Sequence, residues 1–308
     1  MRGGAQRLLL SVVVLACVVV SASQVWAGST PSVVIVTDSK VPQYREAQSA
    51  AQQVLPDGQL LDVNDPELRP QLDRATAASA VLLAIGSKAL LAAQSTGASV
   101  VFCMVLGPSV GSAVGAAKNI TGLRLEVAPS VQFGFIRRVH PKAKRLGVLF
   151  EPRAWAPYVK EATQAAQEQG LTLVTRPVAD ARDVRGALAE IAGDIDALWL
   201  LPDPTLVSVE IFNFLLVSTL ERKIALFGFF ADFTRRGALA SVAPDYTEIG
   251  RQAAKLAAEL AAKPAAARSP LPPSQASPGS LSLNAKTARQ LGLDLSDDAQ
   301  SAAKQVVR

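Results

Sequence analysis

Two serines stand where a buried apolar run meets the start of a helical pattern. Ser87 lies in the sequence Ile-Gly-Ser-Lys, and Ser39 follows the first apolar run in a weaker version of the same arrangement. Backbone N–H groups at a helix N-terminus, with a hydroxyl beside them, attract an anion such as a carboxylate. A serine in this place also serves as the N-cap of its own helix. The spacing therefore predicts either a carboxylate-binding site or helix caps, because both use the same groups.

Aromatic side chains stand at two further junctions of this kind. Phe229 and Phe230 follow the apolar run at residues 224–227, where they would line an apolar pocket or pack in the core. Trp155 lies at the start of a helical pattern and could stack on a bound molecule. An aromatic residue at the start of an amphipathic helix is more often part of the core.

Groups that carry out covalent chemistry are scarce. His140 is the single histidine, and Cys103 is the single cysteine beyond an N-terminal leader. A zinc site built from Cys and His ligands cannot be assembled from these two residues, and a Ser-His-Asp triad would have to use His140. No glycine-rich phosphate-binding loop is present. The sequence predicts a protein that is not an enzyme and that has no catalytic residues, cofactor or metal.

Short apolar segments alternate with helical patterns along the chain. Most of the apolar segments lack the alternation of a half-exposed strand, which is typical of parallel strands covered on both faces. This rhythm predicts an α/β fold with right-handed crossovers. The expected strands are residues 32–37, 59–63, 80–85, 99–105, 145–150, 171–176, 197–201, 224–227, 239–242 and 281–283. The expected helices include residues 41–55, 87–95, 155–169, 184–191 and 206–222, with another from Ala285.

The helix that follows residues 239–242 has the clearest local signals. Asp245 occupies the N-cap position, and Glu248 three residues later completes a capping box. An apolar stripe then recurs at helical spacing, formed by Tyr246, Ile249, Ala253, Leu256 and Leu260. Gly170 follows the helix at residues 155–169 and is expected to end it.

The rhythm is interrupted between residues 106 and 121, where little periodicity remains. We place a crossing between two lobes around residues 119–128 and a return crossing near residues 240–245. Residues 264–279 are rich in Pro, Ala and Ser and indicate an extended linker or surface loop. The predicted organisation is a first lobe of residues 28–122 plus 244–278, a second lobe of residues 123–243, and a C-terminal strand-helix segment of residues 279–308.

The first 27 residues have the layout of a secretory signal peptide. Arg2 and Arg7 give a positive start, residues 8–20 are almost continuously apolar, and Val-Trp-Ala precedes Gly28 as a small-residue cleavage pattern. The apolar run is short for a membrane span. An alternative interpretation makes Cys17 a lipoprotein attachment site, although the residues after it are still apolar. We expect export to the periplasm.

Charge and cysteine content limit the class of partner. The formal net charge of +5 falls to +3 without Arg2 and Arg7, which is too little and too evenly spread to favour nucleic acid. Cys103 alone cannot form an intramolecular disulfide, and its apolar surroundings indicate a small buried side chain.

Several blocks resemble the solute-binding proteins of ABC importers, in the branch associated with aromatic or branched amino acids. They are VFCMVLGP at residues 101–108, NITG at 119–122, KRLGVLF at 144–150, the strand and capped helix at 235–260, and residues 283–293. The blocks follow the family's order over most of the chain.

The resemblance implies a two-lobe periplasmic-binding-protein fold, each lobe a parallel sheet flanked by helices, with a ligand held in the cleft between them. It also implies a small-molecule ligand and an ABC permease in the inner membrane as partners of a monomer. In the family an Asp in the loop after the strand at residues 197–201 meets the ligand's amine. That makes Asp203 the expected ammonium acceptor; the alternative is a turn-forming Asp between two prolines.

Some positions depart from the family pattern. Gly107 stands where the family commonly has Asp before Pro, Glu151 stands where it has Asn, and Phe230 or a neighbour replaces a polar residue of the cleft. Fewer polar groups suggest a more apolar or altered ligand. The expected function is that of a periplasmic solute-binding protein of an ABC importer. The alternative is a sensory or interaction protein of the cell envelope that keeps the fold with altered or no ligand binding.

Overall fold

The computed structural model describes residues 32–114, 117–206, 208–268, 273–276 and 279–308. The predicted signal peptide, its cleavage site and Cys17 lie outside the described residues. Within the described ranges, no helix combines the length and the apolar character that crossing a bilayer requires.

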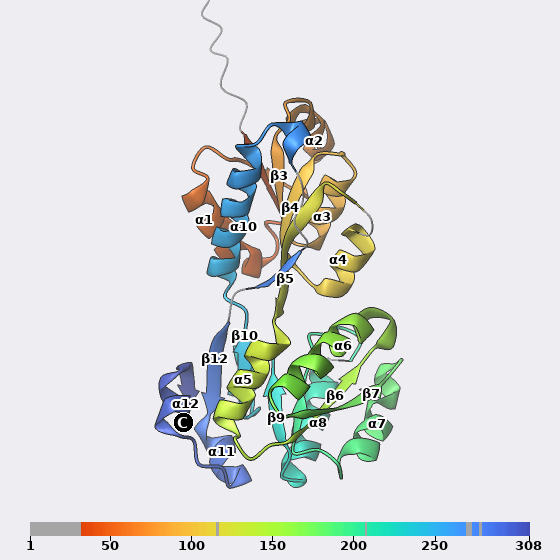
Figure 1. Cartoon of the computed structure of the whole chain (residues 1–308), viewed down its shortest axis with the longest axis vertical. Helices are drawn as coiled ribbons and strands as arrows, with labels where there is room; N and C mark the ends of the chain where they lie inside the picture. The colour runs from red at the N-terminus through yellow and green to blue at the C-terminus, as the bar shows by residue number, and fades with distance from the viewer. Residues whose placement is uncertain (1–31, 115–116, 207, 269–272, 277–278) are drawn as a thin grey trace, which may run out of the picture. The chain divides into compact units, whose positions relative to one another are not determined.

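Two mainly parallel sheets organise the chain (Figure 1). Over the described residues the first sheet has six strands, in the spatial order β11 (Ser274–Ala276), β5 (Ile120–Val127), β4 (Ser99–Val105), β3 (Val81–Ile85), β1 (Val33–Thr37) and β2 (Gln59–Asp62). Every neighbouring pair in it is parallel. Val33 and Val34 of β1 pack into different core clusters, one on each face of the sheet. Because both faces are covered, the strand is apolar at successive positions.

The second sheet has seven strands in the described residues. Their order is β13 (Ala303–Val307), β12 (Ser280–Asn284), β10 (Ala240–Ala243), β9 (Ala225–Gly228), β8 (Ala197–Trp199), β6 (Arg145–Phe150) and β7 (Thr172–Pro177). Only β10 and β12 pair antiparallel among the described pairs of this sheet. The C-terminal strands therefore extend the second sheet.

Helices cover both faces of the first sheet. The helices α1 (Pro42–Val54) and α10 (Tyr246–Ala261) lie side by side on one face (Figure 1). They approach closely because Gly250 has no side chain: a Cβ there would lie 2.1 Å from the carbonyl oxygen of Ala47. The other face is covered by α2 (Leu68–Ala77), α3 (Ser87–Gln94) and α4 (Gly107–Val114).

The second sheet is covered in the same way. One face packs against α5 (Pro129–Val139), α6 (Pro152–Glu168), α11 (Ala285–Leu291) and α12 (Asp297–Ser301). The other face packs against α7 (Val184–Ile191), α8 (Val209–Glu221) and α9 (Ala231–Arg235). Two short 3₁₀ helices, η1 (Ala181–Asp183) and η2 (Ala265–Ala267), complete the described elements.

The chain passes between the two sheets at three places. It leaves the first sheet after β5 at Ala128, returns at Pro244 and Asp245 before α10, and passes again between β11 and β12. These three connections are the covalent links on which any relative movement of the two lobes must turn.

Each strand expected from an apolar run is present, with its ends within two residues of the prediction. The expected helix ends agree to within three residues. Asp245 accepts a hydrogen bond from the backbone N–H of Glu248 at 3.0 Å, and Gly170 adopts a φ of 70° just after α6, so the predicted N-cap and the predicted helix end are confirmed. The Glu248 side chain contacts Gln252 and Arg251, so the described contacts show only the Asp245 half of the predicted capping box. The sequence did not predict β5, β11, β13, α2, α4, α5, α9 or α12. The strand β5 lies where a crossing between the lobes was predicted, around residues 119–128. Its apolar residues alternate with Arg124 and Glu126, so it lacks the continuous apolar run of the predicted strands.

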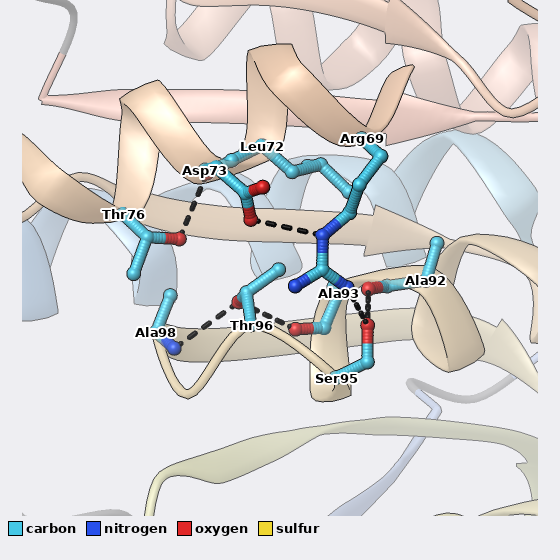
Figure 2. A network of polar contacts seen from close by, with 9 residues as sticks. All are labelled: Arg69, Leu72, Asp73, Thr76, Ala92, Ala93, Ser95, Thr96 and Ala98. Carbon is cyan, nitrogen blue, oxygen red and sulfur yellow. Dashed lines mark hydrogen bonds and ion pairs between the residues drawn. The ribbon is translucent and has the colours of Figure 1, made fainter. Parts of the chain in front are cut away.

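A surface network joins α2 to the end of α3 (Figure 2). The Arg69 guanidinium pairs with Asp73 at 2.9 Å and donates to the Ser95 hydroxyl at 3.0 Å, and that hydroxyl donates to the carbonyl of Ala92. Both charged side chains are more than half exposed, so the pair contributes at most about 1 kcal/mol. The network includes none of the predicted site residues.

Candidate functional site

The loops at the carboxyl ends of the parallel strands contain most of the predicted site residues. Ligands of open α/β sheets bind at this edge, because the loops converge there and helix N-termini point toward the space beyond the strands. In the first lobe these loops contain Asp38 and Ser39 after β1, Ser87 after β3 and Gly107 after β4; in the second they contain Glu151 after β6, Asp203 after β8, and Phe229 and Phe230 after β9.

Three cavities lie among these loops, and residues of both lobes line each of them. The floor cavity, of about 20 Å³, is lined among others by Leu106, Glu126, Gln132, Pro202, Phe229 and Phe230. The tyrosine cavity, of about 530 Å³, is lined among others by Tyr44, Ser87, Met104, Phe230, Asp232 and Tyr246. The arginine cavity, of about 480 Å³, is lined among others by Gly107, Pro108, Arg124, Glu151, Arg153 and Tyr158.

Asp38 forms a buried polar centre directly after β1. Its carboxylate accepts hydrogen bonds from the Asn64 amide at 2.8 Å and the Lys88 ammonium at 2.9 Å, and the Asp38 residue is 2% exposed. The Asn64 amide and then the Lys88 ammonium lower the pKa of the Asp38 carboxyl to about 2. Sequence reasoning missed this residue, although an acidic side chain immediately after a fully buried strand was an available signal.

The two predicted serines have different surroundings. Ser87 is the first residue of α3, whose N-cap is Gly86, and it lines the tyrosine cavity. The Tyr44 hydroxyl is hydrogen-bonded to the backbone of Ser87. Ser87 is therefore not the cap of its own helix. Ser39 is exposed and is hydrogen-bonded to Asp62 at the end of β2.

Phe229 and Phe230 both line the floor cavity, and Phe230 also reaches the tyrosine cavity. Their ring centroids are 4.6 Å apart in an edge-to-face arrangement, and Phe233 packs 4.8 Å from Phe229. The pair is only half-buried, so the two rings form an apolar wall with accessible surface.

Asp203 is 2% exposed and holds two loops of the second lobe together. Its two carboxylate oxygens accept hydrogen bonds from the backbone N–H of Glu151 at 2.9 Å and of Thr205 at 3.0 Å. Asp203 lines none of the three cavities described above. Its predicted role as an ammonium acceptor remains a prediction, and the bonds that the structure gives it are those of a loop-forming residue.

Trp155 lies in the core of the second lobe. Its side chain is 1% exposed, and its ring packs edge-to-face on Tyr158 with centroids 5.7 Å apart. This placement agrees with the core interpretation that the sequence left open. A ligand could reach the ring only after the surrounding core had moved.

A buried amide network anchors the end of β5 to the second lobe. The Gln132 amide donates to the carbonyl of Val127 at 2.7 Å and to the Tyr158 hydroxyl at 3.0 Å, and it accepts from the Trp199 indole at 2.9 Å. The Tyr158 hydroxyl also donates to the carbonyl of Val127. Because every polar group in the set is paired, the start of α5 is fixed on the second sheet.

Glu126 and Arg124 lie beside Gly107, where the sequence departs from the family pattern. The two side chains are two residues apart on β5 and therefore share one face of the strand. The carboxylate of Glu126 accepts a hydrogen bond from the backbone N–H of Gly107, and a Cβ at Gly107 would lie 2.8 Å from Glu126 Oε1. A carboxylate from β5 thus occupies the space that a side chain at residue 107 would fill. The alternation of charge along β5 was the signal for this pair.

Catalytic chemistry finds no support among the described residues. No group of three or more His, Cys, Asp or Glu side chains in the described ranges is placed to hold a metal ion. His140 follows α5 and lines none of the three cavities, and its Nδ1 has no hydrogen-bond partner among the described residues. Cys103 is fully buried in β4, as expected, and burial raises the pKa of its thiol to about 12.

The family described as ABC transporter substrate binding protein matches residues 75–307, which is most of the chain. This chain belongs to that family. No curated protein sequence matches it. The match begins before β3 and extends through β13, so it includes strands of both sheets and the loops that surround the floor cavity.

Solved structures share the fold of this substrate-binding protein. A ligand-free, open substrate-binding protein with adhesive properties from Clostridium difficile is similar with a TM-score of 0.68 at 16% identity, over 89% of this chain and 98% of that one. A domain from Streptococcus pneumoniae in complex with L-Trp is similar with a TM-score of 0.60 at 19% identity, over 89% of this chain and 99% of that one. A conserved domain protein from Vibrio cholerae is similar with a TM-score of 0.59 at 23% identity, over 89% of this chain and 98% of that one. These similarities confirm the predicted two-lobe α/β fold class.

Proposed function

We propose that this substrate-binding protein works in the periplasm, where it collects a small ligand and delivers it to an ABC permease of the inner membrane. The observation that carries the proposal is the position of the three cavities, which lie at the carboxyl ends of the parallel strands and are each lined by both lobes. Family membership supports the same function. The signal-peptide layout of the first 27 residues supports the periplasmic location.

The mechanism has three steps. The ligand enters while the lobes are apart, the lobes close on it, and the permease binds the closed form. The three connections at Ala128, at Pro244 and Asp245, and between β11 and β12 would act as the hinge. The lobes of this proposal are those predicted from the sequence, residues 28–122 plus 244–278 and residues 123–243, except that β5 belongs to the first sheet as far as Val127. The described strands of the predicted segment 279–308 pair in the second sheet.

The proposed ligand is an aromatic or branched amino acid. Phe229 and Phe230 supply an apolar wall for the side chain, and Ser87 supplies a hydroxyl beside the start of α3. The similarity to a domain solved with L-Trp supports testing tryptophan first. Ser39 and Asp203 remain candidates from the sequence, and Trp155 is the weakest because its ring is enclosed by core residues.

A thermal-shift screen of the purified chain starting at Gly28 tests this function. A ligand present at roughly 100 times its dissociation constant stabilises the folded state by about 2.7 kcal/mol, which raises Tm by about 5 °C in a chain of this size. L-Tryptophan, L-phenylalanine, L-leucine and L-isoleucine form the first panel, with the other amino acids as a second. The variant Arg69→Ala, in the surface network of Figure 2, should retain the response.

The negative outcome is equally informative. If no amino acid raises Tm in either panel, the importer role with an amino-acid ligand is contradicted. The sensory or interaction role would then be the better explanation of the same fold.

A further inference from the structure

Glu126 is a buried carboxylate with one oxygen unpaired. The residue is 4% exposed, and Oε2 has no hydrogen-bond partner among the described residues. The other oxygen, Oε1, is held by the backbone N–H of Gly107 at the start of α4. A buried carboxylate oxygen without a hydrogen-bond donor lowers the stability of the folded state considerably. We therefore expect Oε2 to receive a donor from a ligand when that ligand is bound.

The neighbouring polar groups in the described residues do not supply that partner. Arg124, two residues away, has its ion pair with Glu161 of α6 at 3.6 Å; its Nε is buried without a hydrogen-bond partner, and no ion pair between Arg124 and Glu126 is present among the described residues. The Gln132 amide in the same cavity already donates to Val127 and Tyr158 and accepts from Trp199. In this arrangement of the side chains, Oε2 is left open to a donor group from a bound ligand.

The floor cavity beside Glu126 has the size of one small polar group. Its volume of about 20 Å³ exceeds the 10–15 Å³ or so that a single water requires, and an ammonium group is of similar size. Apart from Glu126 and Gln132, its lining is apolar, with Leu106, Phe229 and Phe230 among the walls. Aromatic rings near a cation add a favourable electrostatic contribution.

The negative charge of the Glu126 carboxylate favours a cation over an anion or a neutral group in the floor cavity. Burial raises the pKa of the Glu126 carboxyl, and the backbone hydrogen bonds and Arg124 only partly oppose this. A positive group in the cavity would stabilise the ionised carboxylate, whereas an anion or a neutral apolar group would leave Oε2 without a donor. Asp203, the acceptor expected from the sequence, has both oxygens engaged by backbone N–H groups.

We propose that Glu126 accepts a hydrogen bond from the ammonium group of the ligand and so restricts the substrate class to primary amines with an apolar side chain, a class that includes the apolar free amino acids. This assignment rests on the proposed function, because it specifies which group of the ligand the same cleft recognises. The apolar part of the ligand then extends from the floor cavity along Phe230 toward the tyrosine cavity, which Phe230 and Tyr44 border.

Calorimetric titration with two matched sets of probes tests the assignment. One set is L-tryptophan, tryptamine and indole-3-propionate; the other is L-leucine, 3-methylbutylamine and 4-methylpentanoate. In each set the second probe lacks the carboxylate and the third lacks the amine. The wild-type chain should bind the amine-bearing probes and bind the acid without an amine at least about 30-fold more weakly, because removing one partner of a buried charge pair costs 2 kcal/mol or more.

Three variants complete the experiment. Glu126→Gln keeps an acceptor for the Gly107 N–H but removes the charge, and it should weaken amine-bearing probes at least about 30-fold. It should change the affinity for the acid without an amine by less than about threefold. Asp203→Asn tests the rival acceptor. Glu210→Gln, on α8 and hydrogen-bonded to the Ser208 hydroxyl, is the control and should match wild type.

The outcomes separate the two proposals. If the wild type binds a probe and Glu126→Gln binds it equally well, the role of Glu126 is overturned while the binding function stands. The role of Glu126 is also overturned, while the binding function stands, if indole-3-propionate or 4-methylpentanoate binds as tightly as the amine-bearing probes of its set. This comparison needs only wild-type protein. If the wild type binds none of the six probes, the amine assignment and the amino-acid ligand fail together.

Discussion

The backbone N–H of Gly107 donates a hydrogen bond to the Glu126 carboxylate. This hydrogen bond joins the start of α4 to the end of β5. This contact lies at the boundary of the floor cavity and the arginine cavity. Glu126 is also two residues before Ala128, where the chain leaves the first sheet. A ligand that contacts Glu126 would therefore contact the segment on which the lobes turn.

The first prediction concerns Gly107→Ala. The added Cβ would lie 2.8 Å from Glu126 Oε1, and the carboxylate, being the end of a flexible side chain, should move away. We expect the affinity for amine-bearing ligands to fall about tenfold, or ~1.4 kcal/mol, and Tm to change little. Calorimetry and thermal unfolding measure the two effects. Gly134→Ala on α5, where nothing lies within 4 Å of the added Cβ, is the matched control. Unchanged affinity in Gly107→Ala would contradict the contact.

The second prediction is a pH dependence of stability that comes from Asp38. Its pKa is lowered from 3.8 to about 2 by the Asn64 amide and the Lys88 ammonium, so folding favours the ionised form. A depressed pKa in the folded state contributes stability that is present above the unfolded-state value and is lost as pH falls through about 2. Urea unfolding of wild type should therefore weaken between pH 4 and pH 2 more steeply than that of Asp38→Asn. Parallel pH profiles for the two proteins would rule out this source.

The third prediction tests the amide network at the end of β5. Gln132→Leu leaves the Trp199 indole N–H buried without its acceptor, which should lower the free energy of unfolding by about 1–3 kcal/mol. Trp199→Phe removes the donor as well, so the double variant should lose less than the sum of the single variants. Urea unfolding gives all three values. Gln164→Leu, on the exposed face of α6, is the control. Strict additivity would mean that the bond contributes nothing.

The fourth prediction concerns the contact between α1 and α10. In Gly250→Ala the new Cβ would lie 2.1 Å from the backbone oxygen of Ala47, so the helices must separate. Overpacking of this kind costs typically about 1–3 kcal/mol, which outweighs the gain of up to about 1 kcal/mol from replacing a helical glycine. Thermal unfolding should therefore show a lower Tm. Gly186→Ala on α7, with open space around the added Cβ, should instead raise it slightly.

The sequence by itself determined the local elements. Apolar runs without alternation predicted buried strands such as β1 and β3, and capping at Asp245 with the stripe through Ile249 and Leu260 predicted α10. These signals are local because they depend on residues a few positions apart. The strand β5 escaped prediction because its two charges, Arg124 and Glu126, interrupt the apolar pattern.

The candidate site was predicted only in outline. The sequence located the loops after the strands, and with them Ser87, Phe229 and Phe230, because the ends of apolar runs are visible without a structure. It could not show that the Asp203 carboxylate accepts hydrogen bonds from two backbone N–H groups. Nor could it show that the Trp155 side chain is enclosed by the core.

Tertiary structure alone decided which distant residues meet. The C-terminal strand β12 pairs antiparallel with β10 and so joins the second sheet, a choice that its own apolar residues do not encode. Glu126 meets Gly107 across 19 positions of sequence, and Asp38 meets Lys88 across 50. The reason is physical: periodicity and caps act along one element, whereas sheet order and the pairing of buried charges depend on how all the elements pack together.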